Sequence, residues 1–186
     1  MAPSGKPIPK NWRRKRVFIG GDYDFMANLR EIESAIPKEF EPVLAYDYEV
    51  PKEEIHDTDI SLLSKCGYAI FECTSPAGQL MELERTADFN IEAFVVYQVR
   101  NAKDPPPDHI SSMISTMGAP MFGYSDFREL RAFLRGVFPA IEVDRPKAIL
   151  HILRRSYLPT KYREAATKEL DRALKASQQR TRRGKG

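Results

Sequence analysis

The chain has 186 residues and a mass of 21.3 kDa, and its 42% hydrophobic and 30% charged residues fit one globular domain. No apolar run approaches the roughly 20 residues that a membrane-spanning helix needs, so we expect no membrane span. The two cysteines are too few for a disulfide framework, and no apolar run follows the basic N-terminus. We therefore expect a cytoplasmic protein rather than a secreted one.

The net charge of +3 is unevenly distributed along the chain. Residues 1–16 contain six Lys and Arg, residues 180–186 contain four, and neither segment contains an acid. The two ends thus carry ten positive charges, which leaves −7 for the residues between them. Such ends can contact nucleic acid or another anionic partner. The other interpretation is solvated chain ends, which the lack of interleaved aromatic residues favours.

The first half of the chain alternates predicted strands with predicted helices. Residues 1–15 are rich in Pro and Lys and are expected to be disordered, whereas residues 16–19 form an apolar strand that stops at Gly20 and Gly21. The elements expected next are a helix that ends before Pro37, a strand over 42–46, a polar helix over 53–65 that stops at Gly67, a strand over 68–71, a helix after Gly78 and a strand over 93–99.

The second half begins with a proline-broken loop. The elements expected after it are a short helix over 110–117, an edge strand over 120–124 and a helix that Ser125 caps. Residues 139–186 differ in character, because three prolines interrupt them and residues 160–178 form a long charged helix. We interpret them as a helical extension that packs on the body or on a partner.

Alternating strands and helices, with strands that are apolar throughout, indicate the α/β class with a parallel sheet. Five strands fit a flavodoxin-like, doubly wound sheet over residues 16–138. In this organisation residues 1–15 are a disordered basic tail, and residues 139–186 are a helical extension with a basic tail.

Ligands of open α/β sheets bind beyond the carboxyl ends of the strands, where three loops of this chain are expected to meet. Gly20 and Gly21 follow the first strand and suit a close backbone approach to a phosphate or sugar, although a tight turn is the simpler explanation for the pair alone. Neither a GxGxxG fingerprint nor a P-loop is present.

The stretch SPAGQLMELE over residues 75–84 is the most informative part of the sequence. If a helix begins near Gly78, Glu82 lies one turn in and faces the loop, with Leu80 and Met81 beside it. A carboxylate desolvated by such neighbours can stabilise the positive charge that develops on a sugar when its glycosidic bond breaks. Acids in a first helical turn also occur simply because they complement the helix dipole.

Three segments, VFIGG over 17–21, DFMANLR over 24–30 and AIFECTSPAGQLMEL over 69–83, resemble the nucleoside 2-deoxyribosyltransferase-like superfamily. That group includes deoxynucleoside-5'-monophosphate N-glycosidases and TIR-like nucleotide-binding domains. The resemblance spans about residues 16–138 and implies a flavodoxin-like fold that cleaves the N-glycosidic bond between a base and (deoxy)ribose. It implies that Glu82 is the catalytic glutamate. The resemblance also implies that the first loop contacts the sugar or phosphate, through Gly20, Gly21, Asp22 and Tyr23.

The chain departs from the superfamily pattern in two places. Glu84 stands where the superfamily commonly has Gly, and residues 75–77 lack the Asp that the transferases carry. Either Glu72 or Asp22 could take the place of that Asp.

Two hypotheses follow. In the first, the chain is an N-glycosidase-type hydrolase of a nucleotide, nucleoside or NAD that needs no metal and no cofactor. Glu82 is then the nucleophile or electrostatic stabiliser, and Asp22 or Tyr23 orients it or transfers a proton. The expected substrate-binding residues are Gly20, Gly21, Ser75 and Gly78. In the second hypothesis, the same pocket is a non-catalytic, TIR-like nucleotide sensor that acts through a partner or a homo-oligomer.

Other candidate residues have plainer explanations. Cys73 follows the third strand, where a thiol is either activated by a helix N-terminus or buried as a small apolar residue. His56, Asp57 and Asp59 lie on one predicted helix without a second His, which is a poor metal-site pattern. Tyr46 and Tyr48 either stack on a base or are ordinary edge aromatics.

Overall fold

The computed structural model describes residues 13–48, 55–75, 78–101, 106–108, 119–156 and 160–183. Five strands form one sheet, and every neighbouring pair in it is parallel. Their bounds are Arg13–Gly21 (β1), Glu41–Leu44 (β2), Cys66–Glu72 (β3), Glu92–Gln98 (β4) and Met121–Tyr124 (β5). The order β2-β1-β3-β4-β5 is that of flavodoxin-like folds, so the predicted fold class is confirmed.

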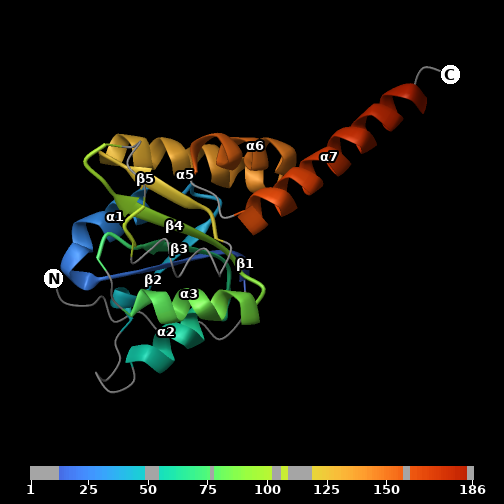
Figure 1. Ribbon diagram of the computed structural model, residues 1–186. Coiled ribbons are helices and arrows are strands. Elements are labelled where there is room, and N and C mark those ends of the chain that lie inside the picture. The colour runs from blue at the N-terminus through green and yellow to red at the C-terminus, as the bar shows by residue number, and fades with distance from the viewer. Residues whose placement is uncertain are drawn as a thin grey trace.

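Helices cover both faces of the sheet (Figure 1). Their bounds are Met26–Ala35 (α1), Ile55–Leu63 (α2), Gln79–Asp88 (α3), Phe127–Ile141 (α5), Arg145–Arg155 (α6) and Thr160–Arg183 (α7), with short 3₁₀ turns at Tyr23–Phe25 (η1) and Ala45–Asp47 (η2). One face packs against α1, α5 and α6, and the other packs against α2 and α3 (Figure 1).

Side chains of each strand alternate between two apolar layers. In β1, Val17 and Ile19 pack on the side of α1 and α5, whereas Phe18 packs on the side of α2 and α3. All three side chains are fully buried. Because helices cover both faces, the central strands are apolar at consecutive positions, which is why they are recognisable in the sequence.

β1 begins at Arg13, three residues before the start predicted from the apolar pattern. Its first residues are basic, but acids on neighbouring elements compensate their charge. Arg13 and Arg16 lie 2.9 and 3.2 Å from the carboxylate of Glu41, and Arg14 lies 3.4 Å from that of Glu142. The start of the strand is therefore held by ion pairs, which an apolar pattern does not reveal.

Gly67 lies inside β3 and not at the end of a helix, which corrects its predicted role, since α2 already ends at Leu63. A Cβ atom at Gly67 would lie 2.1 Å from the carbonyl oxygen of Arg14. The register between β1 and β3 shifts in this region, between Arg13 and Val17. Glycine is thus required here because the two backbones approach closely.

The C-terminal third departs furthest from the predicted elements. Asp126 and not Ser125 caps α5, because its carboxylate accepts the backbone N–H of Glu129 at 2.9 Å. The Ser125 hydroxyl instead donates to the Glu129 side chain at 2.8 Å. α5 continues through Pro139, and α6 lies within the predicted helical extension as a separate helix whose bounds were not predicted. Pro146 lies in the first turn of α6, where proline fits a helix without breaking it.

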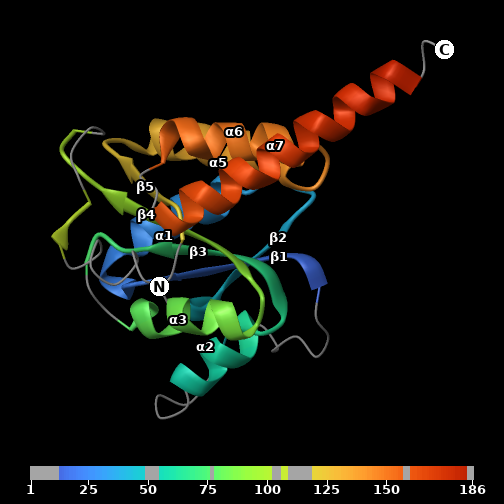
Figure 2. The same ribbon diagram turned by 45° about the vertical axis from the view of Figure 1, so that its right-hand side comes forward.

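The N-terminal half of α7 packs on α6, and its C-terminal half extends away from the body (Figures 1 and 2). α7 continues to Arg183, past the predicted end at residue 178. None of the helices in the described ranges is both long and apolar enough to cross a membrane. The helix predicted over 110–117 and the part of the predicted tail before Arg13 lie outside the described residues.

Candidate functional site

A cavity of about 250 Å³ opens at the carboxyl end of the sheet, between β1 and β3. Strand order reverses at this point, which is where flavodoxin-like folds bind their ligands. The cavity is lined by Phe18, Gly20, Gly21, Asp22, Tyr23, Ala45, Asp59, Gly78, Gln79 and Glu82. Six of the seven predicted site residues therefore line one cavity, and Ser75 is the one that does not.

The two glycines that end β1 make room for neighbouring side chains. A Cβ atom at Gly20 would lie 2.8 Å from Oε2 of Glu82 and 2.9 Å from the ring of Phe71. At Gly21 a Cβ atom would lie 2.6 Å from the side chain of Leu29. The glycine at position 20 thus allows the Glu82 carboxylate to lie directly against the backbone of β1, at the floor of the cavity.

Glu82 lies in the first turn of α3, as predicted, and only 7% of it is exposed. Its pKa is raised to about 8, chiefly by burial and then by the charge and hydrogen bonding of the Asp59 carboxyl. Among the described residues its Oε2 atom has no hydrogen-bond partner. A buried carboxyl oxygen without a partner is costly, which is typical of a group kept available for a ligand.

Asp59 on α2 is the second acid of the cavity and is 8% exposed. Burial raises its pKa to about 6, while hydrogen bonding to Glu82 and the charge of His56 oppose this rise. The two carboxyls therefore titrate as a pair, which we call the Glu82–Asp59 pair. Between the two pKa values this pair holds one proton and one negative charge.

Tyr23 lines the same cavity from η1, and its ring packs edge-on against Tyr46 at a centroid distance of 5.1 Å. Burial raises the pKa of the Tyr23 hydroxyl, and the negative charges of Asp59 and Glu82 raise it further. The hydroxyl stays protonated at neutral pH and can donate a hydrogen bond. Tyr46 therefore supports Tyr23, and no base-stacking role is needed to explain its position.

The other residues of the predicted loops have local structural partners. The Asp22 carboxylate accepts the backbone N–H of Asp24 at 3.0 Å and so caps η1. The backbone oxygen of Ser75 accepts a hydrogen bond from the Gln79 side chain at 2.6 Å. Gln79 is 2% exposed and lines the cavity, although nothing in the sequence singles it out.

Glu72 does not line the cavity but ties its surroundings together. Its fully buried carboxylate accepts hydrogen bonds from Asn28 on α1 at 3.2 Å, from Tyr124 on β5 at 3.1 Å, and from the hydroxyl of Thr74. Gln79 reaches back to the Glu72 backbone oxygen at 3.2 Å. With its oxygens already occupied, Glu72 is a structural carboxylate and a poor replacement for the missing loop Asp.

The alternative chemistry of a reactive Cys73 is not supported. Its side chain is buried, and burial raises the pKa of the thiol, as do the nearby charges of Glu72 and Glu82. The Cys73 thiol is therefore protonated at neutral pH, and a protonated thiol is less reactive than a thiolate. Within the described ranges, no group of three or more His, Cys, Asp and Glu side chains is placed to hold a metal ion.

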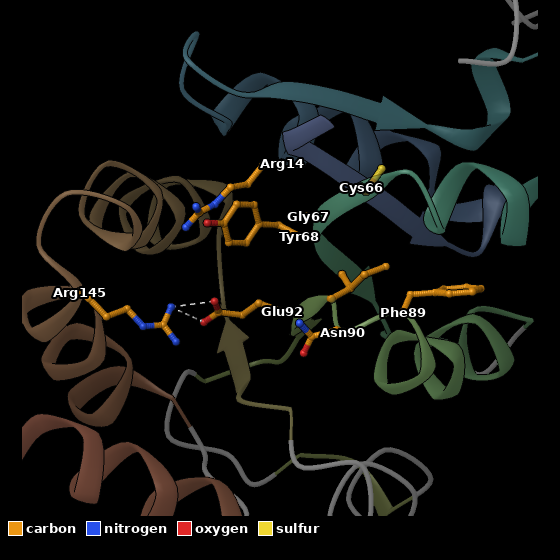
Figure 3. A pocket seen from close by; sticks show the side chains of 9 residues that line it. Arg14, Cys66, Gly67, Tyr68, Phe89, Asn90, Glu92 and Arg145 are labelled. Atoms are coloured by element: carbon orange, nitrogen blue, oxygen red, sulfur yellow. Dashed lines mark hydrogen bonds and ion pairs between the residues drawn. The ribbon is translucent and has the colours of Figure 1, made fainter. Parts of the chain in front are cut away.

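A larger cavity of about 640 Å³ lies at the opposite, amino end of β3 and β4 (Figure 3). Its charged groups already bind one another. Arg145 donates two hydrogen bonds to Glu92, at 2.7 and 2.9 Å, and the Tyr68 hydroxyl donates to Glu142 at 3.2 Å. The smaller cavity is the better candidate site, since it lies at the end of the sheet where such folds bind ligands and contains carboxyls with raised pKa values.

No known family model matches the chain, and no curated protein sequence matches it either. The resemblance to the nucleoside 2-deoxyribosyltransferase-like superfamily therefore stays a prediction.

Proposed function

We propose that the chain hydrolyses the N-glycosidic bond between the base and the (deoxy)ribose of a nucleotide, a nucleoside or NAD. The observation that carries this proposal is the buried Glu82–Asp59 pair, which lies against the end of β1 in a sugar-sized cavity. Most glycoside hydrolases use two carboxyl groups, one charged and one protonated, to break a glycosidic bond. Glu82, which has the higher pKa, is then the protonated carboxyl, and Asp59, which the sequence did not single out as catalytic, is the charged one.

The electrostatics of the cavity favour the transition state of this reaction. When the bond to the base breaks, positive charge develops on the sugar ring at the anomeric carbon. The negative charge of the pair lies in a buried site, where it stabilises that charge more strongly than it would in water. Gly20 contributes by leaving room for the Glu82 carboxylate beside β1.

The proton held by the Glu82–Asp59 pair is available to the leaving base. The bond between the anomeric carbon and the base nitrogen breaks, the base takes the electron pair, and the neutral carboxyl protonates the base as it leaves. Water then adds to the anomeric carbon and returns a proton to the pair. The products are the free base and the (deoxy)ribose or its phosphate, and the protein ends in its starting state. With NAD, nicotinamide leaves as a neutral molecule without that proton, the other product is ADP-ribose, and the proton of the added water goes to solvent.

Neighbouring groups of the cavity would position the substrate. We expect the Tyr23 hydroxyl to donate a hydrogen bond to the sugar or to the charged carboxylate of the pair. Gly21 and Gly78 offer backbone surface at the cavity wall. Asp22 is expected to act chiefly through the turn that it caps, which holds Tyr23 in place.

A nucleotide-sensing module is the second candidate, and α7 favours it. This helix extends away from the body over its C-terminal half (Figure 2), as an element that relays binding to a partner would. A sensor would bind its ligand in the same cavity and leave the base–sugar bond intact.

A product screen by liquid chromatography tests the proposal. The wild type and Asp59→Asn are incubated with deoxynucleosides, deoxynucleotides, ribonucleotides and NAD. We expect release of a free base or nicotinamide by the wild type, and at least about 100-fold slower release by Asp59→Asn, because the carboxylate that stays charged beside the protonated Glu82 is lost. An intact panel together with a rise in melting temperature for one ligand would favour the sensing module instead.

A further inference from the structure

The two halves of α7 differ sharply in charge. Residues 160–171 contain three Lys and Arg and three acids, so that half is neutral. Residues 172–183 contain five basic residues and no acid, which are Arg172, Lys175, Arg180, Arg182 and Arg183. The charge therefore changes in the middle of a single continuous helix.

The neutral half is the anchored one. Ala166 is 5% exposed against the body, and Glu169 accepts a hydrogen bond from Arg145 at 3.0 Å. Arg145 also binds Glu92 at the start of β4, so this arginine joins α7 to the sheet. The basic half extends past these contacts, away from the body, in both views of the molecule (Figures 1 and 2).

The basic positions are also grouped around the helix. At 100° per residue, the five positions fall within about 160° of the helix circumference, over a length of about 16 Å. The basic charge at the other end of the chain is arranged differently. Arg13, Arg14 and Arg16 form ion pairs with Glu41 and Glu142 of the same chain.

We propose that the C-terminal half of α7, residues 172–183, binds the phosphate backbone of duplex DNA without sequence preference. An α-helix fits the major groove, and a repeated row of phosphates matches a helix face that carries only positive charge. This inference does not depend on the proposed hydrolase activity, because none of these residues lines the cavity.

The composition of this half argues against other partners. Leu174 is its only large apolar residue, whereas a helix that lies on a membrane needs an apolar face, and a protein interface needs apolar anchors. It has no aromatic residue on which the bases of a single strand could stack. Duplex phosphates require neither feature.

Fluorescence anisotropy with a labelled 24-base-pair duplex of arbitrary sequence tests the proposal. If all five cations contact phosphate, affinity should fall about 500-fold between 50 and 200 mM salt. The distal variant Arg180→Gln/Arg182→Gln/Arg183→Gln should bind at least about tenfold more weakly at 100 mM salt and should lose more than half of the salt slope. Glutamine keeps a helix propensity close to that of arginine, which circular dichroism checks.

The matched control is Lys161→Gln/Arg163→Gln/Lys168→Gln, which removes three positive charges from the neutral half of the same helix. It should bind the duplex within about twofold of the wild type, and so should Glu82→Gln. Equal binding by the distal variant and the wild type would overturn the proposal. Equally strong binding to polyglutamate, to a single strand or to anionic vesicles would also overturn it, in favour of that partner.

Discussion

At the scale of single residues, the site depends on glycine at position 20. In Gly20→Ala the added methyl would lie 2.8 Å from Oε2 of Glu82 and 2.9 Å from Phe71, so one of them must move. We expect a loss of about 1–3 kcal/mol of unfolding free energy from overpacking, measured by urea denaturation. Gly78→Ala is the control, because nothing lies within 4 Å of its added Cβ. The Gly78→Ala variant should have an unfolding free energy equal to that of the wild type or higher by up to about 1 kcal/mol. An equal loss in both variants would contradict the close approach of Glu82 to β1.

The buried acids also set how stability depends on pH. Both pKa values are raised in the folded protein, to about 8 for Glu82 and about 6 for Asp59, above their ordinary values near 4. A raised carboxyl pKa favours the folded state at low pH, and that stability is lost as pH rises through the folded pKa. The wild type should therefore lose more melting temperature between pH 5 and pH 9 than Glu82→Gln does, by at least about 3 °C.

The exposed acid Glu84 lies on the same helix and serves as the control for this measurement. Glu84→Gln should follow the wild type over the whole pH range, because that side chain is already in water. Parallel curves for the wild type and Glu82→Gln would show that Glu82 ionises normally, and the proposed pair would then be wrong.

At the scale of elements, Arg145 connects three parts of the fold. It binds Glu92 of β4 at 2.7 Å and Glu169 of α7 at 3.0 Å, and it lies in the first turn of α6. Because these groups are partly exposed, we expect Arg145→Gln to cost only about 1 kcal/mol in chemical denaturation. Arg128→Gln, in which the lost arginine is 87% exposed, should change stability by less than about 0.5 kcal/mol. Equal effects would mean that the bridge does not hold α7.

Much of the element pattern is predictable from the sequence, and the failures have identifiable causes. The central strands are apolar throughout, so their existence and the α/β class follow from the sequence pattern. The start of β1 is basic and depends on acids from other elements, and α6 is hidden by Pro146. The start of β1 depends on tertiary ion pairs, and α6 is possible because Pro146 lies in its first turn, where proline is tolerated.

At the scale of the whole molecule, the site is assembled by the topology. Glu82 is predictable from its place after the third strand, whereas Asp59 is not, because it comes from a different helix. Only the packing of α2 beside α3, under the end of β1, brings the two carboxyls together.

The proposed hydrolase activity requires that Glu82 acts in the cleavage of a base–sugar bond. The most direct test is the rate of base release by Glu82→Gln beside Glu84→Gln, two variants that each replace one carboxyl of α3 by a neutral amide. We predict that Glu84→Gln keeps the rate of the wild type within about twofold, while Glu82→Gln loses at least about 1000-fold, equivalent to roughly 4 kcal/mol of transition-state stabilisation. Full activity of a folded Glu82→Gln protein would contradict the claim.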